Sequence, residues 1–285
     1  MLFRSAPAEP TTTEPITTPT TDTRRAAVAC VCGVALVFVG TGGVPIVAAI
    51  MFVTIGVVVA TTAFRRLVPS GTLTMRRGLP SIIAIRGFQT FALFGLDAFV
   101  PHLVHDVRGY SLGTAGSVVT VGVFTWTAGS WIQERLHDRL RPDVLIRIGL
   151  LLNGIGGVGL IASAFPSVPI AFGFVAFGCV GLGMGTGYSA VSVMMLAHAE
   201  PGREGAASAS LSVTDVLFTA VATGIGGACI RLADAQHWTA RSGLVLAYCA
   251  PVVVAFAGVI AASRLHDTTS PPERPFARSN SNVRA

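Results

Sequence analysis

Three charged residues lie inside long apolar stretches of the sequence: Arg86, Asp97 and Asp215. If these stretches are membrane helices, each charge at a helix centre costs about 2.5–3.5 kcal/mol on insertion scales. Charges kept at that cost usually mark a path for ions, protons or substrates. Asp215 could carry a proton when neutral, or face a cation when ionised.

Arg86 and Asp97 fall on one predicted helix. Eleven residues at 100° each leave them about 20° apart around the helix but roughly 16 Å apart along it, too far for a direct salt bridge. Gln89 and Thr90 fall near the same stripe, which Leu93 interrupts. Two alternatives stay open: Arg86 snorkels to the cytoplasmic end, and Asp97 makes a structural hydrogen bond near the outer interface.

Asp215 lies on a face of small and hydroxyl residues that recur at helical spacing. Such a face also suits ordinary helix–helix packing, which is the alternative for its hydroxyls. The candidate substrate and proton pathway is therefore made of Asp215, Asp97, Arg86, Gln89 and Thr219. The full face consists of Ser208, Ser212, Asp215, Thr219, Thr223 and Gly226.

The composition identifies a membrane protein. Of 285 residues 52% are hydrophobic and only 12% are charged, about half the charged share of a soluble domain. The runs 26–64 and 144–196 contain no charge except Arg147. The five cysteines, an odd number within apolar runs, exclude a secreted disulfide scaffold.

Membrane helices of about 20 residues must position these charges. The run 26–64 would be roughly 58 Å long as one helix, and glycines and Pro45 interrupt it, so we expect a hairpin of two helices. The predicted fold is an all-α polytopic protein with about eight transmembrane helices, a hairpin followed by a six-helix bundle. Its predicted spans are 26–41, 44–64, 80–104, 112–132, 144–165, 169–197, 206–230 and 243–263. The predicted regions are a disordered segment (1–23), the hairpin (24–66), the bundle (67–265) and a disordered tail (266–285).

The arginines predict the orientation. All 20 basic residues are Arg, and in the eight-helix arrangement only Arg108, Arg231 and Arg241 fall on the side opposite the termini. The positive-inside rule then places both termini in the cytoplasm. Arginine without lysine, with abundant Ala, Gly and Val, suggests GC-rich coding and hence a bacterial plasma membrane. No basic groove-binding element is present, so nucleic acid is not an expected partner.

The motifs of enzymes and cofactor sites are not matched. A dinucleotide-binding fingerprint needs a third glycine at a fixed spacing and a strand before the first one. The glycines from Gly181 to Gly187 have neither. They form instead two overlapping pairs for close helix contact, Gly181/Gly185 and Gly183/Gly187. No zinc spacing or nucleophile elbow occurs, so we expect neither an enzyme nor a cofactor.

The charged loop between the fourth and fifth predicted helices carries a family resemblance. The segment from Gly129 includes Asp138 and Arg139 and resembles the loop signature G-x-L-x-D-R-x-G-R-R of the major facilitator superfamily. Glu134 and Arg141 stand where that family has glycine. In the family this loop acts as a charge latch between inward- and outward-facing states; the alternative is a loop that only sets topology.

Other stretches are similar to the second half of bacterial 14-helix drug:proton antiporters in that superfamily. They are residues 65–73, 77–80 and 201–209, and the likeness extends over 24–265. It implies that the hairpin matches the two extra linker helices and that the six N-terminal helices are missing. Transport in this family rocks two halves around a midplane site, so one bundle offers half a cavity.

The resemblance implies a secondary transporter, with proton-coupled efflux of a small organic or drug-like compound. Asp215 would handle protons or cations, Arg86 and Asp97 would line the pathway, and Asp138 and Arg139 would serve the latch. Expected partners are the lipid bilayer, the substrate and protons, and a separate N-terminal half or a second copy. A truncated product, part of a split transporter and a self-associating half all stay open. The alternative from another class is a non-transporting membrane scaffold or remnant that packs against a partner protein.

Overall fold

The computed structural model describes residues 21–40, 45–263 and 265, and this part of the chain is all α-helical without a strand. Residues 1–20 and 266–285, predicted to be disordered, lie outside the described residues, whereas residues 21–23 belong to a helix. The eight α-helices in the described ranges are α1 (Thr21–Gly40), α2 (Ile46–Leu67), α3 (Leu79–Asp97), α4 (Leu112–Leu136), α5 (Pro142–Ser163), α6 (Ile170–His198), α7 (Glu204–Ala235) and α8 (Ala240–Ala262).

Local sequence signals mark several helix starts. Ser111 caps α4 by accepting a hydrogen bond from the Thr114 backbone N–H, and Thr239 caps α8 in the same way, as short hydroxyl residues do at N-caps. Pro80 and Pro142 lie in the first turns of α3 and α5, where proline removes no helical hydrogen bond.

The third predicted span is not one regular helix. The α-helical part of α3 ends at Asp97, and a π-helical segment, η1 (His102–Val107), follows directly after Pro101. The predicted span 80–104 therefore joins two elements, and Asp97 is the last residue of the first. The whole stretch Leu79–Val107 is nevertheless long and apolar enough to cross a membrane.

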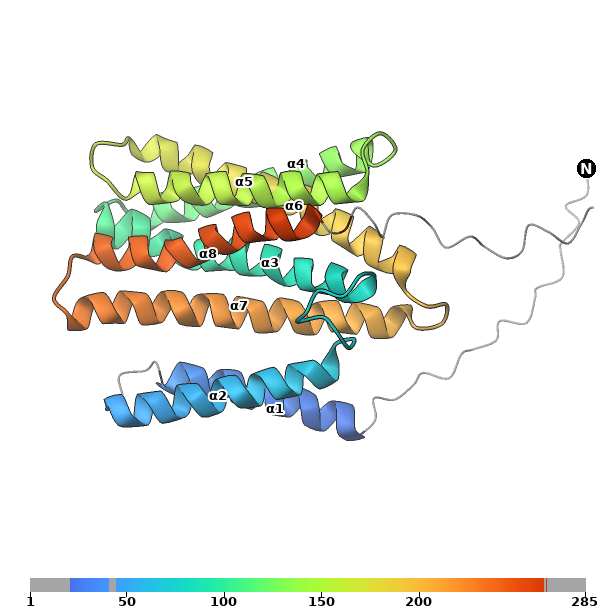
Figure 1. Cartoon of the computed structure of the whole chain (residues 1–285). Coiled ribbons are helices and arrows are strands. Elements are labelled where there is room, and N and C mark those ends of the chain that lie inside the picture. The colour runs from blue at the N-terminus through green and yellow to red at the C-terminus, as the bar shows by residue number, and fades with distance from the viewer. Residues whose placement is uncertain (1–20, 41–44, 264, 266–285) are drawn as a thin grey trace, which may run out of the picture.

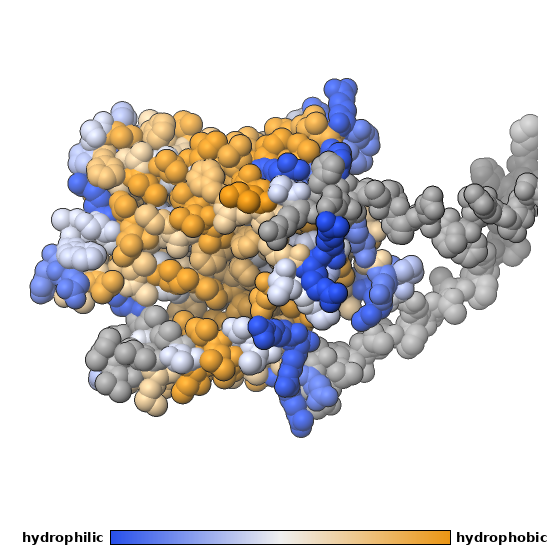
Figure 2. Space-filling view, in the orientation of Figure 1, coloured by the Kyte–Doolittle hydropathy of each residue, from blue (hydrophilic) through white to orange (hydrophobic). Residues whose placement is uncertain are grey.

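Five segments of the described chain are long and apolar enough to cross a membrane: Leu79–Val107, α5, α6, α7 and α8. They fit a membrane-embedded helical protein, while the predicted count of eight spans stays a prediction. The helix α4 is rich in Thr and Gly, which lowers its hydropathy, yet it exposes Phe124 (71%) and Val123 (58%). Figure 2 shows a hydrophobic band along the middle of the molecule with hydrophilic residues toward its ends.

The helix α3 lies at the centre of the bundle and packs against α5, α6, α7 and α8. The helix α4 packs on the outer side of α6, and the α1–α2 hairpin meets the bundle mainly through α7. In Figure 1 the hairpin lies below α7, and α1 begins at the same end of the molecule at which α8 ends. Which end faces the cytoplasm stays a prediction.

The first glycine pair of α6 faces α4. A Cβ on Gly181 would collide with the carbonyl of Gly122, and a Cβ on Gly185 would collide with the carbonyl of Trp126. Gly129 in turn lies against Leu182. These glycines let two backbones approach closely, as predicted for the pair Gly181/Gly185.

The second pair serves a different helix. Gly183 and Gly187 face Gly149 of α5, with the side chain of Gln89 also against Gly187. Two residues advance a helix by about 200°, so two pairs offset by two residues hold α4 and α5 on nearly opposite sides of α6.

We predict that Gly185→Ala lowers the free energy of unfolding by about 1–3 kcal/mol, because the added methyl group overpacks the α4–α6 contact. The measurement is thermal unfolding of the detergent-solubilised protein. Gly227→Ala on α7 is the matched control, since a Cβ there meets nothing within 4 Å. Equal melting temperatures for the two variants would contradict the close α4–α6 approach.

Candidate functional site

The charges of Arg86 and Asp215 meet between α3 and α7. The Arg86 Nε donates to Asp215 Oδ1 at 2.9 Å, and Nη2 donates to Oδ2 at 3.1 Å. The Arg86 side chain is 5% exposed and that of Asp215 is 22% exposed. This is the two-pronged guanidinium–carboxylate geometry that is stronger and more directional than a single contact.

Every partner of the Asp215 carboxylate is a donor. Besides Arg86, the Thr90 hydroxyl donates to Oδ1 at 2.6 Å and the Tyr188 hydroxyl donates to Oδ2 at 2.9 Å. Four donors match the acceptor-only oxygens of an ionised carboxylate, and a neutral carboxyl has one acceptor position fewer.

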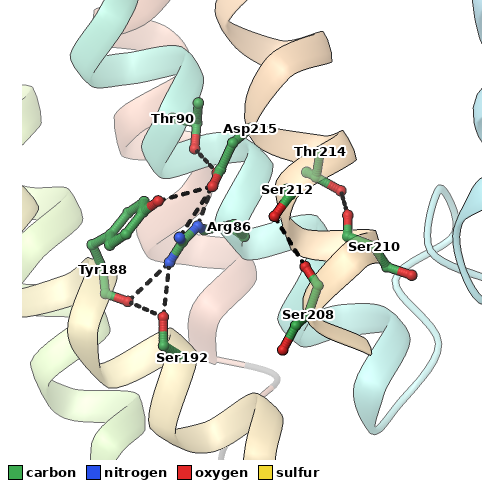
Figure 3. A network of polar contacts seen from close by, with 9 residues as sticks. All are labelled: Arg86, Thr90, Tyr188, Ser192, Ser208, Ser210, Ser212, Thr214 and Asp215. Atoms are coloured by element: carbon green, nitrogen blue, oxygen red, sulfur yellow. Dashed lines mark hydrogen bonds and ion pairs between the residues drawn. The ribbon is translucent and has the colours of Figure 1, made fainter. Parts of the chain in front are cut away.

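The helix α6 supplies the other side of the site. Arg86 Nη1 donates to the Tyr188 carbonyl at 3.0 Å and to Ser192 Oγ at 3.2 Å, and the guanidinium stacks on the Tyr188 ring. Figure 3 shows Thr90 and Asp215 on one side of Arg86, and Tyr188 and Ser192 on the other. The site thus joins α3, α6 and α7.

Packing of α3 against α7 brings the pair together. Gly87, next to Arg86, lies against the ring of Phe218, and a Cβ there would collide with that ring. The same ring meets Phe64 of α2 edge-on, at 6.1 Å between centroids. Phe218 follows Asp215 by less than one turn of α7. The close packing of Phe218 on Gly87 therefore determines how near the side chains of Arg86 and Asp215 can come to each other.

The sequence analysis named Arg86 and Asp215 as candidates but did not pair them, and the structure brings the two side chains together. The snorkelling alternative for Arg86 is wrong, because its guanidinium is buried and fully engaged with α6 and α7. Thr90, expected near the Arg86 stripe, contacts Asp215 instead of a neighbour on its own helix.

Gln89 and Asn153 are fully buried amides near the glycines of α6. Gln89 lies against Gly187 and Asn153 against Gly183, and neither side-chain amide has a hydrogen-bond partner among the described residues. Gln89 therefore lies beside the charged site without reaching Asp215.

Asp97 and Thr219 are not part of this network. Asp97 ends α3, eleven residues after Arg86, and is partly buried. Thr219 is also partly buried, and its backbone carbonyl accepts the hydroxyl of Thr223. The structure does not bring these two predicted pathway residues to Arg86.

The serines on α7 bond locally rather than to the charged pair. Ser212 donates to the Ser208 carbonyl, Thr214 donates to the Ser210 carbonyl, and Ser210 also reaches the Leu67 carbonyl of α2. Figure 3 shows these contacts beside the Arg86 site without joining it. They fit the packing alternative for these hydroxyls.

The loop residues of the predicted latch are exposed. The Asp138 side chain is 83% exposed and pairs with its neighbour His137 at 3.0 Å, and Arg139 is exposed with no ion pair to another described residue. Gly129 is a packing glycine between α4 and α6. The charge that is buried beside this loop is that of Asp143, in the first turn of α5, which the sequence analysis did not name. Its side chain is 0% exposed and pairs with Arg141 at 3.1 Å and with Arg147 at 2.8 Å.

Two arginines at the other end have structural roles. Arg108 donates to three carbonyls of the α5–α6 turn, those of Ser163, Phe165 and Val168, and Arg241 donates to the Ala164 carbonyl. They satisfy carbonyls that a helix end leaves open.

The sequence analysis did not name Tyr188 or Ser192 as site residues. A signal for the ion pair itself was present, because a guanidinium and a carboxylate within one apolar bundle are expected to pair. Tyr188 and Ser192 also lie one turn apart on one face of α6.

Comparisons with known proteins give no family for this chain. No protein-family model matches it, and no curated protein matches it either. Among the described residues, no group of three or more His, Cys, Asp or Glu side chains could hold a metal ion.

We predict non-additive effects of changing the pair. Arg86→Met or Asp215→Leu alone should each lower the free energy of unfolding by about 3–5 kcal/mol, because each leaves one buried charge without its partner. The double variant should recover most of this loss, since apolar pairs of similar volume replace buried ion pairs at little cost. The measurement is the free energy of unfolding of the wild type, the two single variants and the double variant in one detergent. If the two single losses simply add in the double variant, the two charges do not interact.

Proposed function

We propose that the chain is one half of a secondary membrane transporter, in which protonation of Asp215 drives the conformational change. The observation that carries the proposal is the Arg86–Asp215 pair, buried among apolar helices and shared by α3, α6 and α7. A charged pair at such depth is costly, and its retention favours a role in moving ions or protons.

The proposed step is a proton added to the Asp215 carboxylate. The neutral acid loses its ionic attraction to Arg86 and gives up one acceptor position. The Arg86 guanidinium keeps its contacts with the Tyr188 carbonyl and Ser192, so it stays with α6 while α7 is released. Loss of the proton restores the pair, which makes the α3–α7 contact a two-state element.

The substrate class is a small organic, drug-like compound, with efflux exchanged for protons. The resemblance to the drug:proton antiporters supports this choice. Because one bundle supplies half of a cavity, the second half comes from a second copy or a separate chain of the same architecture.

A non-transporting membrane scaffold is the second candidate. It is favoured by the exposure of Asp138 and Arg139. Among the described residues, neither side chain forms an ion pair with another helix, so the two residues do not act as a latch there. In that case the Arg86–Asp215 pair only fixes the packing of three helices.

The two candidates predict different results for flux through vesicles that contain the full chain. With an imposed pH gradient and ethidium as a fluorescent probe, a transporter gives gradient-dependent flux, and Arg86→Met/Asp215→Leu abolishes it while the variant inserts and unfolds like the wild type. Asp215→Asn should likewise remove the dependence on the gradient.

Gly227→Ala, which touches neither the pair nor a neighbouring helix, is the control for flux. Equal gradient-dependent flux in the wild type and the double variant would contradict the proton role of Asp215. No flux from correctly inserted wild-type protein would contradict transport by this chain alone and favour the scaffold.

A further inference from the structure

The α1–α2 hairpin touches the bundle at few points. Ser210 of α7 donates to the Leu67 carbonyl at 3.2 Å, and Phe64 meets Phe218 edge-on. Both contacts lie toward the end of the hairpin at which α2 finishes. Elsewhere α1 also approaches α7, for example where the Phe38 ring lies close to Gly224, and two apolar hollows remain between these contacts.

Together they form a groove between the hairpin and α7. The hollows have volumes of about 490 and 310 Å³ and adjoin at Val34 of α1 and Leu217 of α7, which line both. On α7 the lining runs from Ser212 to Leu232, a rise of roughly 30 Å, which equals the thickness of a bilayer hydrocarbon core.

The walls of the groove are almost entirely hydrocarbon. The hydroxyls in the lining belong to Thr61 and Ser212, and Ser212 already donates to the Ser208 carbonyl. Water at this depth would find almost no partner, so a hydrocarbon chain is the favoured occupant.

One end of the groove carries a cluster of arginines. Arg24 continues the stripe of Ala27, Val31 and Val34 that lines the groove on α1. Arg65 and Arg66 end α2 beside Leu67, which also lines it. Arg24, Arg65 and Arg66 are all exposed, and none has an ion pair with another described residue.

Three carboxylates lie near this end in the described chain. Asp22, in the first turn of α1, is the one nearest in sequence to Arg24 and Arg25. Glu200, just before α7, is engaged with Arg203 at 3.0 Å, and Glu204 lies in the first turn of α7. A further hollow of about 280 Å³ lies beside Arg65, lined by the connector residues Val68–Thr74. The end of the groove therefore offers positive charge and room for a head group.

We propose that this groove binds one anionic phospholipid from the leaflet on the arginine side. One acyl chain lies between α1 and α7 from Ser212 toward the bilayer midplane, and the phosphate meets Arg24, Arg65 and Arg66. The lipid fills the space that the hairpin leaves and ties the hairpin to the bundle. The site is separate from the Arg86–Asp215 pair and does not depend on a transport activity.

The test is native mass spectrometry and thermal unfolding of the full chain with phosphatidylglycerol or with phosphatidylcholine of the same acyl chains. Phosphatidylglycerol should be retained as one molecule per chain, several-fold more strongly than phosphatidylcholine, and should raise the melting temperature. Arg65→Gln/Arg66→Gln should remove the preference for the anionic lipid.

A second variant tests the groove without changing a charge. Gly224→Leu adds a side chain to the lining, where a Cβ lies 3.8 Å from the Phe38 ring, and should reduce retention of both lipids. Gly227→Leu, on the same helix but with nothing within 4 Å, should not. Equal retention of the two lipids, retention unaffected by Gly224→Leu, or a dimer that closes the groove in place of lipid would each overturn the proposal.

Discussion

The ionic contact between Arg86 and Asp215 is the constraint around which the bundle is arranged. Either charge alone in an apolar interior would carry an uncompensated desolvation cost, and the pair forms only if α3 and α7 lie close together at one depth. Gly87 permits that approach by leaving room for Phe218. The Tyr188 hydroxyl and backbone then fix the third helix, α6, to both charges.

Glycines of α6 then set the positions of two further helices. Gly185 lies against α4 and Gly183 lies against α5. The two helices pack on nearly opposite sides of α6, because two residues turn a helix by about 200°. A change in the ion pair would therefore act on α6 directly and on α4 and α5 through tight backbone contacts. The hairpin, in contrast, meets mainly α7 and leaves a groove whose length matches the bilayer core.

Much of this could be predicted from the sequence, and the missing part has a physical reason. Apolar length was enough to predict the helices of the described chain, and the glycines and Pro45 predicted the break after α1. The pairing of Arg86 with Asp215 was not predicted, because the residues are 129 positions apart and their contact depends on which helix faces which. Asp143 was missed for a related reason: its burial follows from two arginines that fold over it at the start of α5, a local arrangement that a count of charges does not contain.

The central claim is that the charge on Asp215 holds α3 and α7 together. The most direct measurement is the distance between spin labels at Thr74 and Ala206, near the starts of these helices, on a cysteine-free background at neutral and at acidic pH. The account predicts that acidification changes this distance in the wild type and leaves it unchanged in Arg86→Met/Asp215→Leu. The same distance at both pH values in the wild type, or the same shift in the double variant, would contradict it.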